Sequence, residues 1–275
     1  MSDKHRTQLK HLAPVLASLL FGLACAFLIS TSSVEPYQVA PFSEDTFGFF
    51  GSFGNAFYFA ILAGVGASLI YILLKRSKKR LITFITGLAL TTAAFMLSMV
   101  YLYAALSRFS IPYIDVLIPV VSALITAASD YLVFRSSRYS NIVVLGMGGA
   151  LGTFLGFSIP TASAILVLAV LAIYDTFAVY RGPVGKIAER GLDQLRGLSF
   201  SFRDIQMGLG DLTFYSMLSG HMLLALGVVS CLASMAGILV GCAVSLRMAE
   251  KKGMFPGLPF PVFLGLAAGF AASLL

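Results

Sequence analysis

Apolar residues occur along the chain in long runs that are separated by short clusters of polar and charged residues. Runs of about 17–25 apolar residues have the length that an α-helix needs to cross roughly 30 Å of hydrocarbon. Because lipid offers the backbone no hydrogen-bond partners, such runs are expected to be helical. The pattern predicts an all-α polytopic membrane protein with nine transmembrane helices, at residues 12–31, 52–74, 81–105, 111–134, 141–157, 160–180, 206–222, 224–247 and 255–274.

The boundary between the seventh and eighth predicted helices is marked only weakly. The stretch 208–246 contains one charged residue, Asp211, and its only hint of a turn is the triplet Ser219–His221. A single helix over this stretch would have about 40 residues, which is twice a bilayer crossing. We therefore expect two helices with a turn near this triplet.

The composition agrees with a membrane protein. Hydrophobic residues make up 58% of the 275 residues and charged residues only 11%, whereas a soluble domain typically has about 25% charged residues. So few charges cannot cover a water-facing surface, which disfavours a soluble bundle of helices. The three cysteines lie inside apolar runs without a C-x-x-C pair, and the three histidines are scattered, so neither a disulfide framework nor a metal site is predicted.

Basic residues predict the orientation of the helices. All lysines and arginines except Arg108 lie at the N-terminus or in the second–third, fourth–fifth, sixth–seventh and eighth–ninth connections. The opposite set of connections holds Arg108, and its first member is acidic, with Glu35, Glu44 and Asp45. Under the positive-inside rule this alternation predicts an N-in, C-out topology. Since topology accounts for the net charge of +7, no nucleic-acid partner is predicted.

Four aspartates fall within the predicted spans, and two of them have a simple explanation. A charged group at membrane depth costs roughly 2.5–3.5 kcal/mol on insertion scales, so each is a candidate functional group. Asp115 lies near the outer end of its span, where its carboxylate reaches the interface. Asp130 precedes Arg135 by five residues, which favours an interfacial pair. We expect structural roles for both.

Asp175 and Asp211 have no such explanation. Asp175 lies about five residues, or roughly 8 Å, from the cytoplasmic end of the sixth predicted helix, and Asp211 lies at a similar depth in the seventh. The two helices are consecutive and antiparallel, so the carboxylates can face each other. Close carboxylates cannot both ionise easily and share one proton, as in aspartic proteases. Taken without any family, the pair indicates an intramembrane hydrolase or a proton-coupled carrier equally well.

Two short motifs contain these aspartates, and a third lies at the start of the ninth predicted helix. They are Tyr174-Asp175, Gly208-Leu209-Gly210-Asp211 and Pro256-Gly257-Leu258. In order and placement they resemble the Y-D, G-x-G-D and P-A-L motifs that the presenilin and signal peptide peptidase family of intramembrane aspartyl proteases carries on helices six, seven and nine of nine. The resemblance covers the helix count and residues 160–275, and Gly257 replaces the family's alanine.

The resemblance implies an intramembrane aspartyl endopeptidase with Asp175 and Asp211 as its catalytic pair and no cofactor. The other motif residues are expected to shape the site and position the substrate: Tyr174, Gly208, Leu209, Gly210, Pro256, Gly257 and Leu258. Glycines beside Asp211 would let water and a substrate backbone approach it closely. Residues 1–157 are expected to form a scaffold of five helices, and residues 158–275 a catalytic bundle of four.

The expected partners are the lipid bilayer of the cell membrane and substrates within it, either transmembrane segments or remnant signal peptides. The N-in, C-out topology matches presenilin rather than signal peptide peptidase, whose topology is inverted, and the short loops favour a prokaryotic, archaeal type of the family. A proton- or cation-coupled transporter that uses the same carboxylate pair is the alternative. No oligomeric state is predicted.

Overall fold

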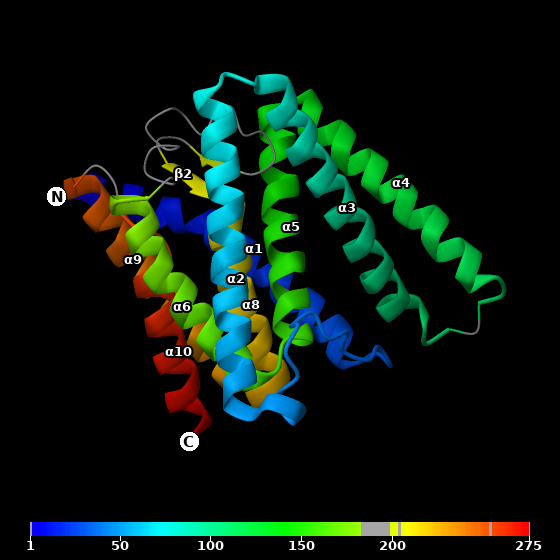
Figure 1. Ribbon diagram of the computed structural model, residues 1–275. Helices are drawn as coiled ribbons and strands as arrows, with labels where there is room; N and C mark the ends of the chain where they lie inside the picture. Colours follow the sequence, from blue (N-terminus) through cyan, green and yellow to red (C-terminus); the bar gives the residue numbers. More distant parts are fainter. Residues whose placement is uncertain (1, 110, 183–198, 203–204, 253–254, 275) are drawn as a thin grey trace.

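The computed structural model describes residues 2–109, 111–182, 199–202, 205–252 and 255–274 (Figure 1). Within these residues the chain forms helices and one β-hairpin. In chain order they are α1 (Ser2–Ser30), α2 (Glu44–Lys75), α3 (Lys79–Leu106), α4 (Ile114–Arg135), α5 (Ser137–Ser158), α6 (Thr161–Tyr180), β1 (Ser199–Phe202), β2 (Ile205–Gly208), α8 (Leu209–Leu226), α9 (Val228–Lys252) and α10 (Pro259–Ser273).

Each predicted span corresponds to one helix, and among the described residues seven helices are long and apolar enough to cross a membrane. The two that fall short are α10, which has 15 residues, and α8, which has 18 residues and carries several polar side chains. The predicted helical architecture is therefore confirmed. The count of nine crossings and the N-in orientation remain predictions.

The predicted turn at Ser219–His221 is wrong, because α8 continues through it and ends before Gly227. Gly227 has a φ of +92°, a conformation that glycine adopts without strain. Gly220 is buried against α5, and the His221 Nδ1 lies 2.7 Å from the carbonyl oxygen of Gly156 in α5. Gly220 and His221 thus contact α5, the Ser219 hydroxyl donates to the Ser216 carbonyl oxygen within α8, and the triplet does not mark a turn.

The seventh predicted helix begins at Leu209, later than the expected residue 206, because β2 precedes it. Strands β1 and β2 are antiparallel, with Ser199 opposite Gly208. The alternation Ser-Phe-Ser-Phe in β1 is typical of a strand. The prediction of an all-α protein is therefore corrected by one small hairpin that leads directly into α8.

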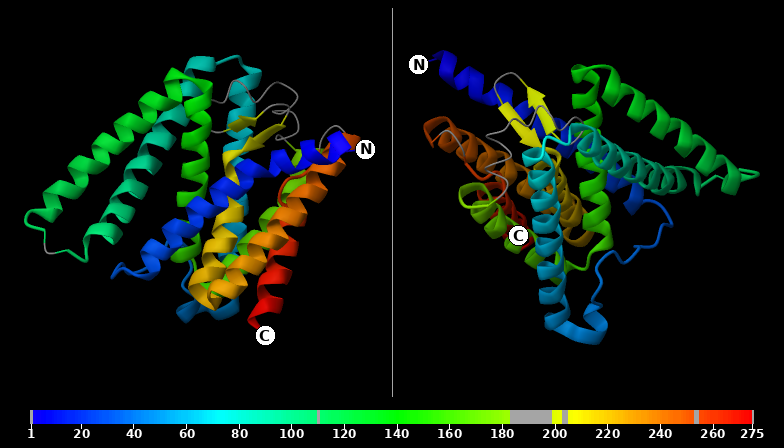
Figure 2. Two further views of the ribbon diagram at one scale, coloured as in Figure 1. Left: turned by 180° about the vertical axis from the view of Figure 1, so that it is seen from behind. Right: turned by 45° about the horizontal axis from the view of Figure 1, so that its top comes forward.

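Helix α8 lies at the centre of the bundle, with α5, α1, α9 and α10 packed around it (Figures 1 and 2). Glycine permits the closest approaches, as is common between membrane helices. A Cβ atom added to Gly152 of α5 would lie 2.2 Å from the Thr213 carbonyl oxygen of α8. One added to Gly241 of α9 would lie 2.4 Å from the Pro261 Cα of α10. Backbone therefore touches backbone at both helix pairs.

The helices α3 and α4 form a hairpin that leans away from this centre (Figure 2). Within it the Asp130 carboxylate accepts a hydrogen bond of 2.7 Å from the Thr91 hydroxyl. The predicted pairing of Asp130 with Arg135 is wrong, since the Arg135 guanidinium lies 5.3 Å from the ring centre of Tyr131, over its face. Asp115 is exposed in the first turn of α4, where the helix dipole stabilises a carboxylate.

Helix α2 is the most exposed of the apolar spans, and it packs mainly on α6. Polar contacts join the ends of the two helices. The Glu44 carboxylate accepts hydrogen bonds of 2.7 Å from the Ser52 hydroxyl and from the Ser163 backbone N–H in the first turn of α6. The Asn55 amide donates to the Ser163 hydroxyl at 2.9 Å. Glu44 thereby satisfies one of the unpaired N–H groups with which α6 begins.

Replacing Glu44 with glutamine is expected to lower the stability of the protein at neutral pH and to leave it unchanged in acid. Burial opposes ionisation of Glu44, but the hydrogen bonds from Ser52 and Ser163 outweigh it and lower its pKa below the ordinary 4.5. The stabilisation is therefore complete above pH 4.5 and is lost as the pH falls through the lower, folded-state pKa. A charge at a helix N-terminus is worth about 0.3–1 kcal/mol.

The measurement is the melting temperature of wild type and Glu44→Gln between neutral and acidic pH. The two curves are expected to converge in acid. Glu35→Gln, a change at an exposed position in the connection before α2, is the matched control and should follow the wild type throughout. A difference in melting temperature between Glu44→Gln and wild type that stays constant across the pH range would contradict a role for the Glu44 charge.

Candidate active site

The two candidate carboxylates lie on neighbouring helices at the same end of the bundle. Asp175 lies in the last turns of α6, and Asp211 lies in the first turn of α8, where a negative charge is favoured by the helix dipole. Both side chains are half-buried, and their charges are close enough to interact. The structure therefore brings together the two aspartates that the sequence placed at matching depth.

The segment 256–258, which precedes α10, lies against both carboxylates. The Leu258 backbone N–H donates a hydrogen bond of 3.0 Å to Asp175 Oδ2. Gly257 lies so close to Asp211 that an added Cβ would be 2.9 Å from its Oδ2. An alanine here would displace the Asp211 carboxylate or the segment by a few tenths of an ångström. The three predicted motifs thus meet at one place.

Among the described residues, the two glycines of the second motif have no close neighbours. An added Cβ at Gly208 would meet no described atom closer than 3.9 Å, and one at Gly210 none closer than 4.0 Å. Gly210 is also exposed. Packing within the described protein therefore does not require glycine at either position.

Two of the predicted site residues also pack against other helices. The Tyr174 ring packs toward α2, where its hydroxyl would lie 3.4 Å from a Cβ added to Gly64. Leu209 packs against α5 beside Gly148 and contributes to the hydrophobic core. Both contacts are those of packing residues. Within the described part of the chain, no three His, Cys, Asp or Glu side chains gather as metal ligands would.

Tyr215 belongs to this site but was missed by the sequence analysis. Its side chain is 1% exposed, and its hydroxyl donates a hydrogen bond of 2.8 Å to the Gly257 carbonyl oxygen. A tyrosine in an apolar run resembles an ordinary core residue. The available signal was its position four residues after Asp211, which places both side chains on one face of α8.

Comparison with known proteins finds similar folds among solved structures but no match by sequence. No protein-family model matches the chain, and no curated protein matches its sequence. Its fold and its seven apolar helices define a multi-pass integral membrane protein.

Among solved structures, the chain is similar to a presenilin family intramembrane aspartate protease determined in the C222 space group. The TM-score is 0.68 and the identity 20%, over 97% of this chain and 98% of the other. A presenilin family intramembrane aspartate protease in the P2 space group gives a TM-score of 0.65 and an identity of 21%, over 96% and 97% of the two chains. The chain thus has the presenilin fold along nearly its whole length.

Proposed function

We propose that the protein is an intramembrane aspartyl endopeptidase, with Asp175 and Asp211 as its catalytic pair. The observation that carries the proposal is the convergence of both carboxylates on segment 256–258, one bonded to the Leu258 N–H and the other in contact with Gly257. A pair of interacting carboxylates is the arrangement that acid–base hydrolysis of an amide requires. The presenilin fold supports the same assignment.

In the proposed reaction the two carboxyl groups share one proton. The ionised carboxylate takes a proton from water, whose oxygen attacks the carbonyl carbon of the scissile bond, and the protonated carboxyl gives its proton to the carbonyl oxygen. The tetrahedral gem-diol then collapses: the amine leaves with a proton from one carboxyl group as the C–N bond breaks, and a gem-diol hydroxyl gives its proton to the other carboxylate, so that the pair again shares one proton. The Leu258 N–H fixes the orientation of the Asp175 carboxylate during these steps.

The proposed substrates are transmembrane segments or remnant signal peptides. A helical substrate must unwind locally, which leaves its backbone groups without partners in an apolar environment. Strand β2 ends at Gly208, three residues before Asp211, so the hairpin offers backbone groups to an extended substrate strand next to the site. Under the predicted N-in topology, preferred substrates have their N-termini outside. The division into a scaffold at 1–157 and a catalytic bundle at 158–275 belongs to the same proposal.

The test is cleavage of a single-pass reporter by the purified protein in proteoliposomes, with the products identified by mass spectrometry. Cleavage within the transmembrane segment is expected, and a peptidic transition-state mimic of aspartic proteases should stop it. The alternative, a proton- or cation-coupled transporter, predicts flux that depends on an ion gradient and is insensitive to the mimic. Flux of that kind without cleavage would overturn the proposal.

Changing Gly210 to alanine is expected to lower cleavage about tenfold or more, because a substrate backbone displaced by even 1 Å reacts far more slowly. The melting temperature should not fall, since the added Cβ finds its nearest described atom, in the Phe214 ring, at 4.0 Å. Initial rates and melting curves of the same preparation provide the measurement. Unchanged cleavage would show that a substrate does not use the space beside this glycine.

A further inference from the structure

Tyr215 and Asp175 hold opposite ends of the same peptide group. The Tyr215 hydroxyl donates to the Gly257 carbonyl oxygen at 2.8 Å, and the N–H of the next residue, Leu258, donates to Asp175 Oδ2 at 3.0 Å. The C=O and the N–H belong to one planar unit, the Gly257–Leu258 peptide group. A continuous line of hydrogen bonds therefore runs from α8 through this group to the carboxylate on α6.

From this line we infer that Tyr215 is a positioning residue, which orients and polarises the Gly257–Leu258 peptide group as the donor to Asp175. Hydrogen bonds in a chain strengthen one another, because a bond accepted by the carbonyl makes the N–H of the same amide a better donor. The inference rests on the proposed function of Asp175. It assigns Tyr215 an effect on the reaction without contact with the substrate.

Burial and neighbouring groups fix the Tyr215 hydroxyl in place. The side chain is 1% exposed, and the Cys242 thiol of α9, which is 2% exposed, neighbours the hydroxyl. The ionisable groups that face this region are Asp211 and Tyr215 from α8, Tyr174 from α6 and Cys242 from α9. Three helices and the segment before α10 are thus linked through one phenol group.

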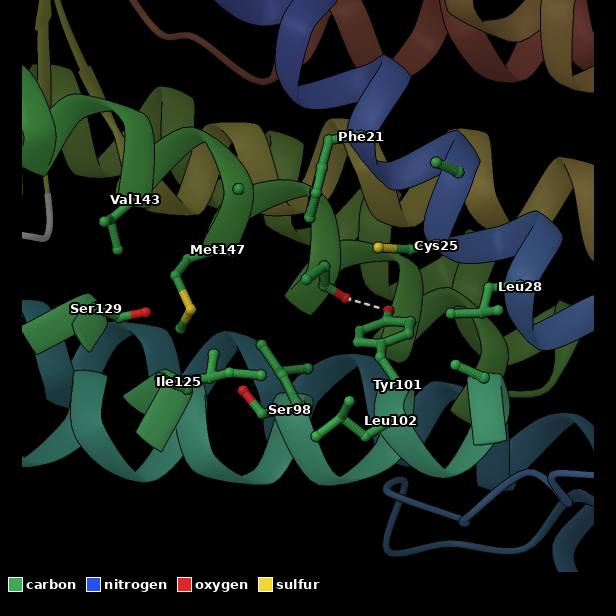
Figure 3. Close-up of a pocket in the computed structure, with 16 residues that line it drawn as sticks. Phe21, Cys25, Leu28, Ser98, Tyr101, Leu102, Ile125, Ser129, Val143 and Met147 are labelled. Atoms are coloured by element: carbon green, nitrogen blue, oxygen red, sulfur yellow. Dashed lines mark hydrogen bonds between the residues drawn. The ribbon is translucent and has the colours of Figure 1, made fainter. Parts of the chain in front are cut away.

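The chain provides a closely matched control in Tyr101. Its hydroxyl donates a hydrogen bond of 2.7 Å to the Ala150 carbonyl oxygen and also neighbours a thiol, that of Cys25 (Figure 3). The hydrogen bond from Tyr101 to Ala150 joins α3 to α5. It lies beside an apolar cavity of about 520 Å³, which is lined by α1, α3, α4 and α5. Tyr101→Phe therefore removes the same chemical contact as Tyr215→Phe at a place unconnected to the carboxylates.

The experiment compares Tyr215→Phe with Tyr101→Phe. Both variants should lower the melting temperature, because each removes one hydrogen bond from a phenol to a backbone carbonyl. Only Tyr215→Phe should lower kcat, by about tenfold for one hydrogen bond of ordinary strength, while KM stays unchanged. The acidic limb of its kcat profile should move to higher pH, since a weaker donor favours ionised Asp175 less. Equal kcat values and pH profiles in the two variants would overturn the inference.

An infrared titration of the carboxyl stretching bands, assigned with Asp175→Asn, separates this inference from the proposed function. Tyr215→Phe should shift the Asp175 band and its titration whether or not the protein cleaves a reporter, and Tyr101→Phe should not. A protein without protease activity that still shows this shift would refute the proposed function and support the hydrogen-bonded line. An unshifted Asp175 band in Tyr215→Phe, with an active wild-type protease, would refute the positioning role of Tyr215 and would not affect the proposed function.

Discussion

Replacing Asp211 with asparagine is expected to abolish cleavage of a transmembrane reporter while the helices stay folded. Asparagine has nearly the same shape as aspartate but cannot take up or release a proton, so the pair loses its acid–base function. General acid–base catalysis contributes about 10²–10⁴-fold, so a loss of at least this size is expected. Asp175→Asn should have the same effect. The double variant should be no worse than either single variant, because residues that act as a unit are not additive.

These variants should lose cleavage without losing stability. Holding two interacting carboxylates half-buried among apolar helices is unfavourable. Removing one potential charge is therefore expected to keep or raise the melting temperature, as is common where function strains a site. Asp130→Asn is the control within the membrane region. Its carboxylate is bonded to Thr91 on the distant α3–α4 hairpin, so cleavage should be normal. Substantial cleavage by Asp211→Asn would refute the assignment of the pair.

Changing Gly152 to alanine is expected to cause the largest loss of stability among single-methyl changes. The new Cβ would lie 2.2 Å from the Thr213 carbonyl oxygen and 2.7 Å from the Met217 nitrogen, and neither backbone atom can rotate away. Helices α5 and α8 must therefore separate, at a cost of about 3 kcal/mol. Cleavage should fall as well, since α8 carries Asp211. Gly241→Ala should act similarly between α9 and α10, where the clash with Pro261 is 2.4 Å.

Gly66 of α2 is the matched control for this prediction. An added Cβ there meets no described atom within 4 Å, so Gly66→Ala should keep or slightly raise stability, because alanine favours a helix by about 1 kcal/mol over glycine. Melting curves in detergent and the fraction of monodisperse protein measure both variants. Equal melting temperatures for Gly152→Ala and Gly66→Ala would contradict a rigid contact between α5 and α8.

The sequence was most informative where one physical requirement dominates. Long apolar runs predicted every helix that the structure describes, because lipid leaves the backbone no other way to satisfy its hydrogen bonds. The cost of a charge in the membrane likewise identified Asp175 and Asp211, since an unexplained carboxylate stands out in such a run. Glycines at helix contacts, by contrast, are too common in membrane bundles to reveal which helix each one faces.

The errors arose where a polar residue has its partner in a distant segment of the chain. Ser219–His221 suggested a turn, but His221 is bonded to Gly156 of α5. Asp130 suggested a nearby arginine, yet its partner is Thr91, on a different helix. Tyr215 escaped notice because its carbonyl partner follows some forty residues later. Contacts between distant segments are set by the packing of the whole bundle and cannot be derived from local spacing.

The central position of α8 has a consequence for the way the protein responds to the membrane around it. An 18-residue helix spans about 27 Å, but α8 is enclosed by other helices and need not match the thickness of the bilayer. The exposed α2 must match it, and α2 packs on α6, which carries Asp175. A thinner or thicker bilayer is therefore expected to move Asp175 along the membrane normal relative to Asp211, which lies on the enclosed helix α8. The acyl-chain length of the lipid would thus change the relative position of the two carboxylates without any ligand.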